Sequence, residues 1–264
     1  MPPATLFTDA DNTLWDTDRV FAAAQLALLE TVEAATGAEV VASDRLAFVR
    51  SLDQGIAGRH HAGLRYPPRL LARALALDLA GADTGRAVRL ALVGGEANQR
   101  LSETQAAAAE LAFVAAIQAL PPLRLGVEEG LEALHAAGCL ILMVTEGARD
   151  KIAGTAAAHG IARFIDRIIE SPKRPDLYRR VLRLTPVAGR AFMVGDQLDR
   201  DIAPAKSAGL ETIWFPGGFR PRWEPEVEEV APDHVVTSFR EVLGIVTGQT
   251  PQEDPRADRG GPST

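Results

Sequence analysis

The chain has 264 residues, of which 47% are apolar and 24% charged, and its 28 basic and 35 acidic side chains give a net charge of −7. This composition is typical of a soluble globular protein and excludes a chain that is mostly disordered, collagen-like or coiled-coil. A dedicated nucleic-acid-binding protein needs a basic face, so the acidic balance argues against nucleic acid as a partner. Cys139 is the single cysteine, which excludes a disulfide framework and a cysteine-rich zinc site.

The N-terminal sequence MPPATLFTDAD lacks the basic flank and the apolar stretch of a signal peptide. No apolar run approaches the roughly 18 residues of a membrane-spanning helix. A lone cysteine in an apolar run also suits a reducing compartment. We therefore expect a cytoplasmic protein without a membrane partner.

The first half of the chain predicts one strand followed by a block of helices. The apolar run at residues 4–8 stops at the polar sequence DADNT, which is typical of a buried strand that ends in a loop. Over residues 17–121 the apolar positions recur every three or four residues, which predicts helices. The expected helices span residues 18–35, 44–53, 68–79, 84–101 and 103–120.

The second half alternates helix and strand, which is typical of a parallel sheet with crossover helices. The expected helices span residues 127–137, 149–159, 175–184 and 201–208, and the expected strands span residues 139–145, 164–170, 190–194 and 211–215. The first strand must join this sheet, because an isolated strand cannot satisfy its backbone groups. The sequence thus predicts an α/β core of residues 1–16 and 122–247, interrupted by a helical insertion of residues 17–121. Residues 248–264 are rich in proline, glycine and charge and predict a disordered tail.

Acidic residues follow two of the predicted strands. Asp9 and Asp11 come directly after the first strand, and Asp196, Asp199 and Asp201 follow a late one. The carboxyl ends of parallel strands share one edge of the sheet, so these side chains can converge. Converging carboxylates repel each other unless a cation joins them, and Mg²⁺ with oxygen ligands resolves that repulsion.

Two further strand ends offer groups that a phosphate needs. Thr145 and Gly147 supply a hydroxyl and backbone donors after one strand, and Lys173 supplies an ammonium after another. The lysine is informative because only three of the 28 basic residues are lysines, Lys151 and Lys206 being the other two. A compact point charge is thus selected at this position in a chain that otherwise uses arginine.

Four sequence elements in this order, DADNT, VTEG, Lys173 in SPKRPDLY and VGDQLDRD, resemble the motifs of the haloacid dehalogenase-like hydrolase superfamily, in particular its phosphatase branch. The resemblance covers residues 4–247. It implies an α/β fold with a Rossmann-like parallel sheet and an all-helical cap of the first type inserted after the first strand. It also implies a magnesium-dependent phosphatase that hydrolyses a small phosphorylated metabolite through an aspartyl-phosphate intermediate.

The resemblance also assigns roles to single residues. Asp9 would be the nucleophile, and Asp11 would protonate the leaving oxygen and then activate water. Thr145, Gly147 and Lys173 would bind the oxygens of the transferring phosphoryl group.

In the same scheme the metal would be held by the Asp9 carboxylate, the Asp11 backbone carbonyl and Asp196. Asp201 would orient the metal shell directly or through water. Asp199 could instead cap the following helix or join that shell. Glu146 stands where many relatives carry asparagine, and we expect it to face away from the phosphate.

Residues 45–73 of the insertion carry six arginines and one acid, Asp53, which predicts a locally positive segment that could steer an anionic substrate. His60 and His61 lie in this segment, with a solvated loop as the alternative. Trp15, beside the DADNT loop, either lines the entrance of the site or packs at the hinge of the cap.

Other activities on the same scaffold remain open at this point. A phosphomutase would keep every core residue and differ only in shielding the aspartyl-phosphate from water. A non-hydrolytic protein that binds a phosphorylated ligand would keep the pocket without turnover. A dehalogenase would need neither a metal nor Asp11, so the acidic residues argue against it.

Overall fold

The computed structural model describes residues 4–95, 99–185 and 189–248. The chain divides into two compact units, one formed by Met1–Asp16 with Pro122–Thr264 and the other by Thr17–Pro121. Of the predicted tail, residues 248–264, all but Gly248 lie outside the described residues. Among the described residues, no helix combines the length and the apolar character needed to cross a membrane.

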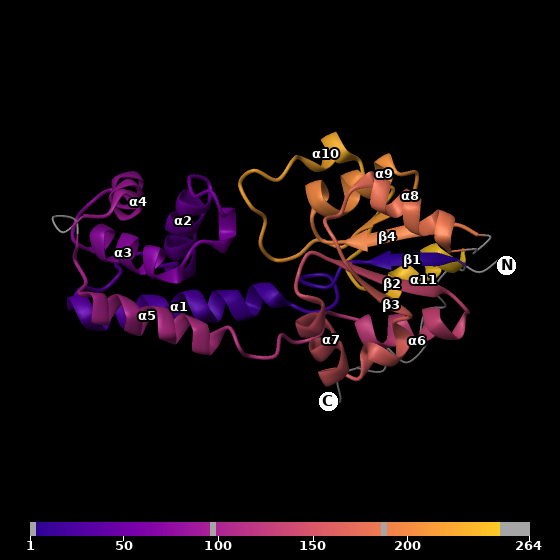
Figure 1. The fold of residues 1–264 in the computed structure, drawn as a ribbon, viewed down its shortest axis with the longest axis horizontal. Helices are drawn as coiled ribbons and strands as arrows, with labels where there is room; N and C mark the ends of the chain where they lie inside the picture. The colour runs from indigo at the N-terminus through magenta and orange to yellow at the C-terminus, as the bar shows by residue number, and fades with distance from the viewer. Residues whose placement is uncertain (1–3, 96–98, 186–188, 249–264) are drawn as a thin grey trace, which may run out of the picture. The chain divides into compact units, whose positions relative to one another are not determined.

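The first unit contains a six-stranded, fully parallel sheet with the order β3-β2-β1-β4-β5-β6. Figure 1 labels its neighbouring strands β3, β2, β1 and β4. Its strands are β1 (Thr5–Thr8), β2 (Leu140–Thr145), β3 (Arg167–Glu170), β4 (Ala191–Gly195), β5 (Glu211–Trp214) and β6 (His234–Val235). Strand β1 is buried along its whole length and pairs with β2 and β4. The expected α/β, Rossmann-like fold is confirmed, and the loops after β1, β2 and β4 open at one edge of the sheet.

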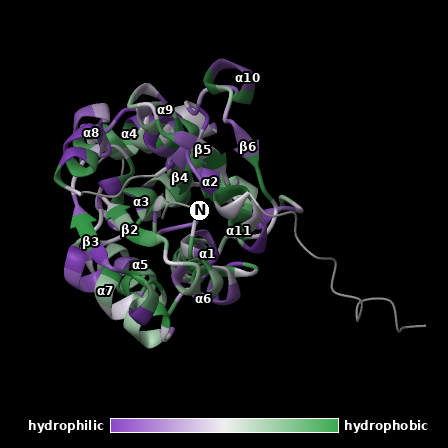
Figure 2. Cartoon of the chain, turned by 90° about the vertical axis from the view of Figure 1, so that its right-hand side faces the viewer, coloured by the Kyte–Doolittle hydropathy of each residue, from purple (hydrophilic) through white to green (hydrophobic). Residues whose placement is uncertain are grey.

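Helices cover both faces of this sheet, with α8 and α9 on one face and α6 and α7 on the other (Figure 1). The helices of this unit are α6 (Val127–Ala136), α7 (Arg149–Ala158), α8 (Pro175–Leu184), α9 (Ala203–Ser207), α10 (Val227–Val230) and α11 (Arg240–Thr247). The alternation along the strands produces two apolar layers, because neighbouring side chains point to opposite faces. Leu6 belongs to one layer and Phe7 to the other. Figure 2 shows β2 in the green of apolar residues, as expected for a strand covered on both faces.

The described residues of the second unit form helices joined by loops, with their own apolar core. Its helices are α1 (Thr17–Thr36), α2 (Arg45–Ala57), α3 (Pro68–Leu79), α4 (Thr84–Val93) and α5 (Glu103–Ala116). Asp44 and Asp83 cap the starts of α2 and α4, and Ser102 forms a capping box with Gln105 at the start of α5.

Several predicted boundaries were wrong. The helix predicted over residues 84–101 ends at Val93, because Gly94 adopts a φ of 71° that terminates the helix. The strand predicted over residues 164–170 begins only at Arg167, after a 3₁₀ turn at Ile161–Phe164. The helix predicted over residues 201–208 is a π-helical turn, Leu198–Ile202, followed by α9.

The arginines that make residues 45–73 positive in the sequence are largely compensated by acids of other helices. Four of the six form ion pairs within the helical unit: Arg45 with Glu33, Arg50 with Asp18, Arg69 with Glu110, and Arg73 with Glu103. The excess positive charge expected from this segment is therefore mostly neutralised in the fold. His60 stacks on His61 in the same segment, with ring centroids 4.3 Å apart.

Candidate active site

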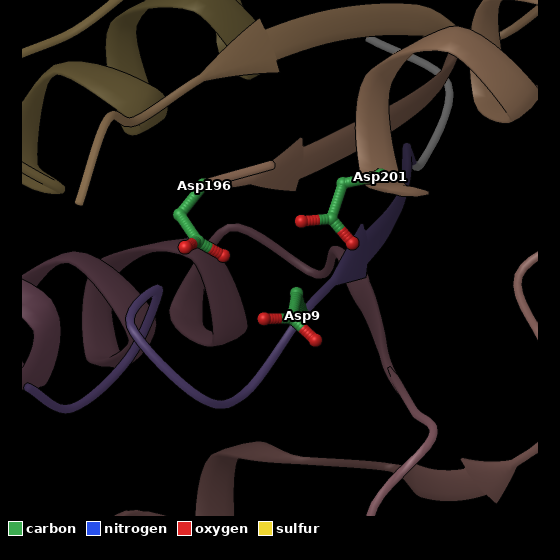
Figure 3. A group of neighbouring side chains, drawn as sticks. All are labelled: Asp9, Asp196 and Asp201. Carbon is green, nitrogen blue, oxygen red and sulfur yellow. The ribbon is translucent and has the colours of Figure 1, made fainter. Parts of the chain in front are cut away.

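Three buried carboxylates meet at the carboxyl edge of the sheet. Asp9 follows β1, and Asp196 and Asp201 follow β4, the strand that pairs with β1. One carboxylate oxygen from each lies within 4.8 Å of the others, and the residues are 5%, 5% and 1% exposed. Figure 3 shows the three side chains gathered in one place, with the carboxylates of Asp196 and Asp201 directed toward Asp9. The sequence placed them at one edge, and the structure brings them together.

Glycine at the end of β4 permits this convergence. A Cβ atom on Gly195 would lie 2.4 Å from the Cβ of Asp201, closer than two such atoms can approach. The π-helical turn folds back over the strand end at this point, and the Gln197 N–H donates to Asp201 Oδ2 at 2.9 Å. The local sequence thus directs the Asp201 carboxylate toward Asp9 and Asp196.

Lys173 is the cation of this cluster. It comes from the loop between β3 and α8, and its Nζ donates to Asp9 Oδ1 and, at 2.5 Å, to Asp201 Oδ1. Its side chain is only 7% exposed. Burial alone would lower the pKa of Lys173, but the carboxylates of Asp201 and Asp9 together raise it above its ordinary value. The ammonium is therefore charged at neutral pH.

The same burial opposes ionisation of the acids. Desolvation raises the pKa of Asp9 to about 7, against the lowering effect of Lys173 and with the support of the Asp201 charge. Desolvation and the charges of Asp201 and Asp9 also raise the pKa of Asp196 well above its ordinary range. Three carboxylates and one ammonium together carry a net charge of −2 when all are ionised. This hard-oxygen donor set fits a divalent cation such as Mg²⁺.

The remaining residues of the first loop surround this cluster. The Thr13 hydroxyl lies 3.3 Å from Asp9 Oδ2 and 3.4 Å from Asp196 Oδ1. Asp11 is not a member of the three-carboxylate group, and its Oδ1 accepts a hydrogen bond from Trp15 Nε1 at 3.0 Å. Asp199 is exposed and lies in the first residues of the π-helical turn, whose N-cap position is Gln197.

Thr145 and Gly147 lie at the end of β2, next to β1. Thr145 is buried, and its Oγ1 accepts a hydrogen bond from the Gly147 N–H at 3.0 Å. Its carbonyl accepts from the Ser171 N–H at 2.9 Å, which ties the β2 end to the loop of Lys173. Glu146 accepts from the Lys173 N–H at 3.3 Å, so it belongs to the same set of loops.

Two interactions around the site were not anticipated from the sequence. Glu146 forms an ion pair with Arg200, which precedes Asp201. The Arg124 guanidinium donates to the carbonyls of Asn12, Phe215 and Pro216 at 2.5, 2.9 and 2.7 Å, and it stacks 3.5 Å from the Phe215 ring centroid.

Arg124 thus joins the first loop to the loop after β5. Asn12 itself adopts a φ of 59°, a left-handed conformation that glycine and asparagine tolerate best. Neither the Glu146–Arg200 ion pair nor the Arg124 hydrogen bonds could be predicted from residue spacing, because each depends on the conformation of loops.

Comparisons with known proteins agree with this arrangement. A family model described as haloacid dehalogenase-like hydrolase matches residues 3–209. A glyceraldehyde 3-phosphate phosphatase of Pyrococcus furiosus is 34% identical over 73 residues, which are 27% of this chain and 30% of that protein. A phosphoserine phosphatase of Thermus thermophilus is 31% identical over 129 residues, which are 46% of this chain and 50% of that protein. The chain thus matches at most half the length of these curated relatives.

Among solved structures, YfnB of Bacillus subtilis bound to magnesium is similar with a TM-score of 0.59. The two sequences are 20% identical, and the similarity covers 93% of this chain and 99% of that one. At this level of identity the likeness demonstrates a shared fold.

Proposed function

Because the chain belongs to the haloacid dehalogenase-like hydrolase family, we propose that it is a magnesium-dependent phosphatase that hydrolyses a small-molecule phosphomonoester through an aspartyl-phosphate intermediate. The observation that carries the proposal is the buried group of Asp9, Asp196 and Asp201 with Lys173 bonded to two of its members. The two phosphatases among the relatives support the reaction class.

Asp9 and Asp196 would hold the metal, with the Asp11 backbone carbonyl beside them and Asp201 as a direct or water-mediated partner. The proposed metal fits the chemistry of these residues, because three buried carboxylates share a single lysine ammonium. When bound, Mg²⁺ neutralises that charge and polarises the phosphoryl oxygens.

The residues of the chain perform the transfer in two steps. An Asp9 carboxylate oxygen forms a bond to phosphorus while the bond to the leaving oxygen breaks, and Asp11 gives that oxygen a proton. Water then attacks phosphorus and gives a proton to Asp11, which releases phosphate and restores Asp9. Thr145, Lys173 and Gly147 bind the transferring oxygens.

The substrate we propose is a small phosphorylated metabolite. The helical unit, Thr17–Pro121, would act as a cap that excludes water during transfer and contacts the leaving group. Such a lid leaves little room for a folded protein substrate.

The test is phosphate release from p-nitrophenyl phosphate and from a broad panel of phosphorylated metabolites, with Mg²⁺ and with a chelator. We expect release that requires Mg²⁺ and is absent in Asp9→Asn. Release that survives both chelation and that substitution would refute the mechanism. Transfer of the phosphoryl group to a second position of the substrate, without free phosphate, would identify a mutase instead.

A further inference from the structure

Trp15 directs a hydrogen-bond donor at the proposed acid of the reaction. Its Nε1 lies 3.0 Å from Asp11 Oδ1, and the residue is 1% exposed. We propose that Trp15 is a positioning residue, whose indole N–H holds the Asp11 carboxyl group in the orientation needed to protonate the leaving oxygen. This inference rests on the proposed function and extends it to a residue outside the motifs.

Both the backbone and the ring of Trp15 contact other residues of its own unit. The Trp15 carbonyl accepts from the Asn12 N–H at 2.8 Å, and the residue bridges to Leu123 of the returning chain. Its ring stacks on the His159 imidazole with centroids 6.5 Å apart, and it belongs to the apolar core below the sheet edge. The buried indole therefore holds its N–H donor in place beside the partly exposed Asp11 side chain.

The chemistry of the indole defines what the bond can do. Tryptophan only donates, so its partner must be an accepting oxygen, and in the acid form of Asp11 the proton resides on the other oxygen. In the first step the bond from Asp9 to phosphorus forms and the bond to the leaving oxygen breaks. The leaving oxygen keeps the electron pair of that bond and takes the Asp11 proton.

Leaving groups differ in their need for that proton. An alkoxide is a strong base and must be protonated as it departs, whereas p-nitrophenolate is stable as an anion and departs without help. A defect confined to the orientation of Asp11 should therefore slow the hydrolysis of alkyl phosphates and leave the hydrolysis of p-nitrophenyl phosphate almost unchanged. A general loss of structure should slow both to the same degree.

The experiment compares Trp15→Phe with the wild type, in Mg²⁺, on both kinds of substrate. Phenylalanine removes the N–H and retains an aromatic ring. We expect kcat/KM, which reports the steps through phosphoryl transfer to Asp9, to fall about tenfold or more for an alkyl phosphate and less than about twofold for p-nitrophenyl phosphate. Trp223→Phe, at an exposed tryptophan, is the matched control and should change neither value.

A double variant tests whether Trp15 acts through Asp11. Asp11→Asn should show the same selective loss for alkyl phosphates, and adding Trp15→Phe to it should cause no further selective loss. Equal losses on both substrates, or no loss, would overturn the role of Trp15 while leaving the phosphatase proposal intact. A wild-type protein that releases no phosphate from either substrate would overturn the proposed function and this inference with it.

Discussion

Asp9 and Lys173 are buried partners of opposite charge in a cluster with more acids than bases. A neutral substitution of the acid should therefore stabilise the metal-free protein, whereas a neutral substitution of the lysine should destabilise it. For Asp9→Asn we expect the metal-free protein to gain more than about 1 kcal/mol in free energy of unfolding at pH 8. The reason is that the pKa of Asp9 is raised from 3.8 to about 7 despite Lys173, so the charged form is penalised, and one pKa unit corresponds to about 1.4 kcal/mol. Urea denaturation in a chelator measures this, and a loss of stability would contradict it.

Lys173→Met should instead destabilise the protein by about 3–5 kcal/mol, because it leaves buried carboxylates without their cation. The matched control is Lys151→Met on α7, an exposed lysine whose loss should change stability by less than about 0.5 kcal/mol. Equal effects of the two substitutions would show that the Lys173 charge does not stabilise the site.

At the residue scale, the members of the acidic cluster could be predicted because strand ends in a parallel sheet share an edge. The predicted strands alone placed Asp9, Asp196 and Asp201 at this edge. For Lys173 the prediction also used the small number of lysines in the chain. The roles assigned to them remain predictions. The Arg124 contacts could not be foreseen, since they depend on the path of two loops that spacing does not encode.

Among the elements, the end of β4 is sensitive to added volume. Gly195→Ala would place a methyl group 2.4 Å from the Asp201 Cβ and so displace the π-helical turn. We expect a loss of about 1–3 kcal/mol in stability and weaker Mg²⁺ binding. Gly154→Ala in α7 is the matched control, because its Cβ would meet nothing within 4 Å, and helix propensity predicts a gain of about 0.5–1 kcal/mol. Equal stability of the two variants would contradict the role of Gly195.

The order and type of the elements were easier to predict than their ends. The alternating pattern predicted a parallel sheet, and the sheet is parallel throughout the described residues. The helix predicted to continue to residue 101 stops before Gly94, because the positive φ of this glycine turns the backbone out of the helix. Strand β6 was missed because two residues carry no measurable alternation.

At the scale of the whole molecule, the positive charge of residues 45–73 was overestimated, because counting charges within one segment leaves out the acids of the helices that pack against it. Four of the six arginines of residues 45–73 pair with acids on α1 and α5, which lie 12 to 41 residues away in the sequence. A local excess of basic residues therefore predicts a positive surface only when acids of other elements do not pair with them.

Metal binding should couple the stability of the protein to pH. In the metal-free protein the raised pKa of Asp9 means that the folded state holds more protons than the unfolded state between about pH 4 and 7, so stability falls as pH rises through this window. Mg²⁺ competes with those protons. We expect Mg²⁺ at a hundred times its dissociation constant to add about 2.7 kcal/mol at pH 8 and clearly less at pH 6 when its concentration is held fixed.

Thermal unfolding with and without Mg²⁺ at both pH values checks this prediction. Asp196→Asn, which removes one proposed ligand, should lose most of the stabilisation at pH 8. A Mg²⁺ effect that is the same at both pH values, or unchanged in Asp196→Asn, would place the metal elsewhere.

The central claim is that Asp9 takes the phosphoryl group. The most direct measurement is to quench the Mg²⁺-loaded protein with acid during turnover of a phosphate-labelled substrate and to map the label by peptide mass spectrometry. The account predicts label on the Asp9 carboxylate and none in Asp9→Asn. Label on another residue, or rapid turnover without any labelled protein, would contradict it.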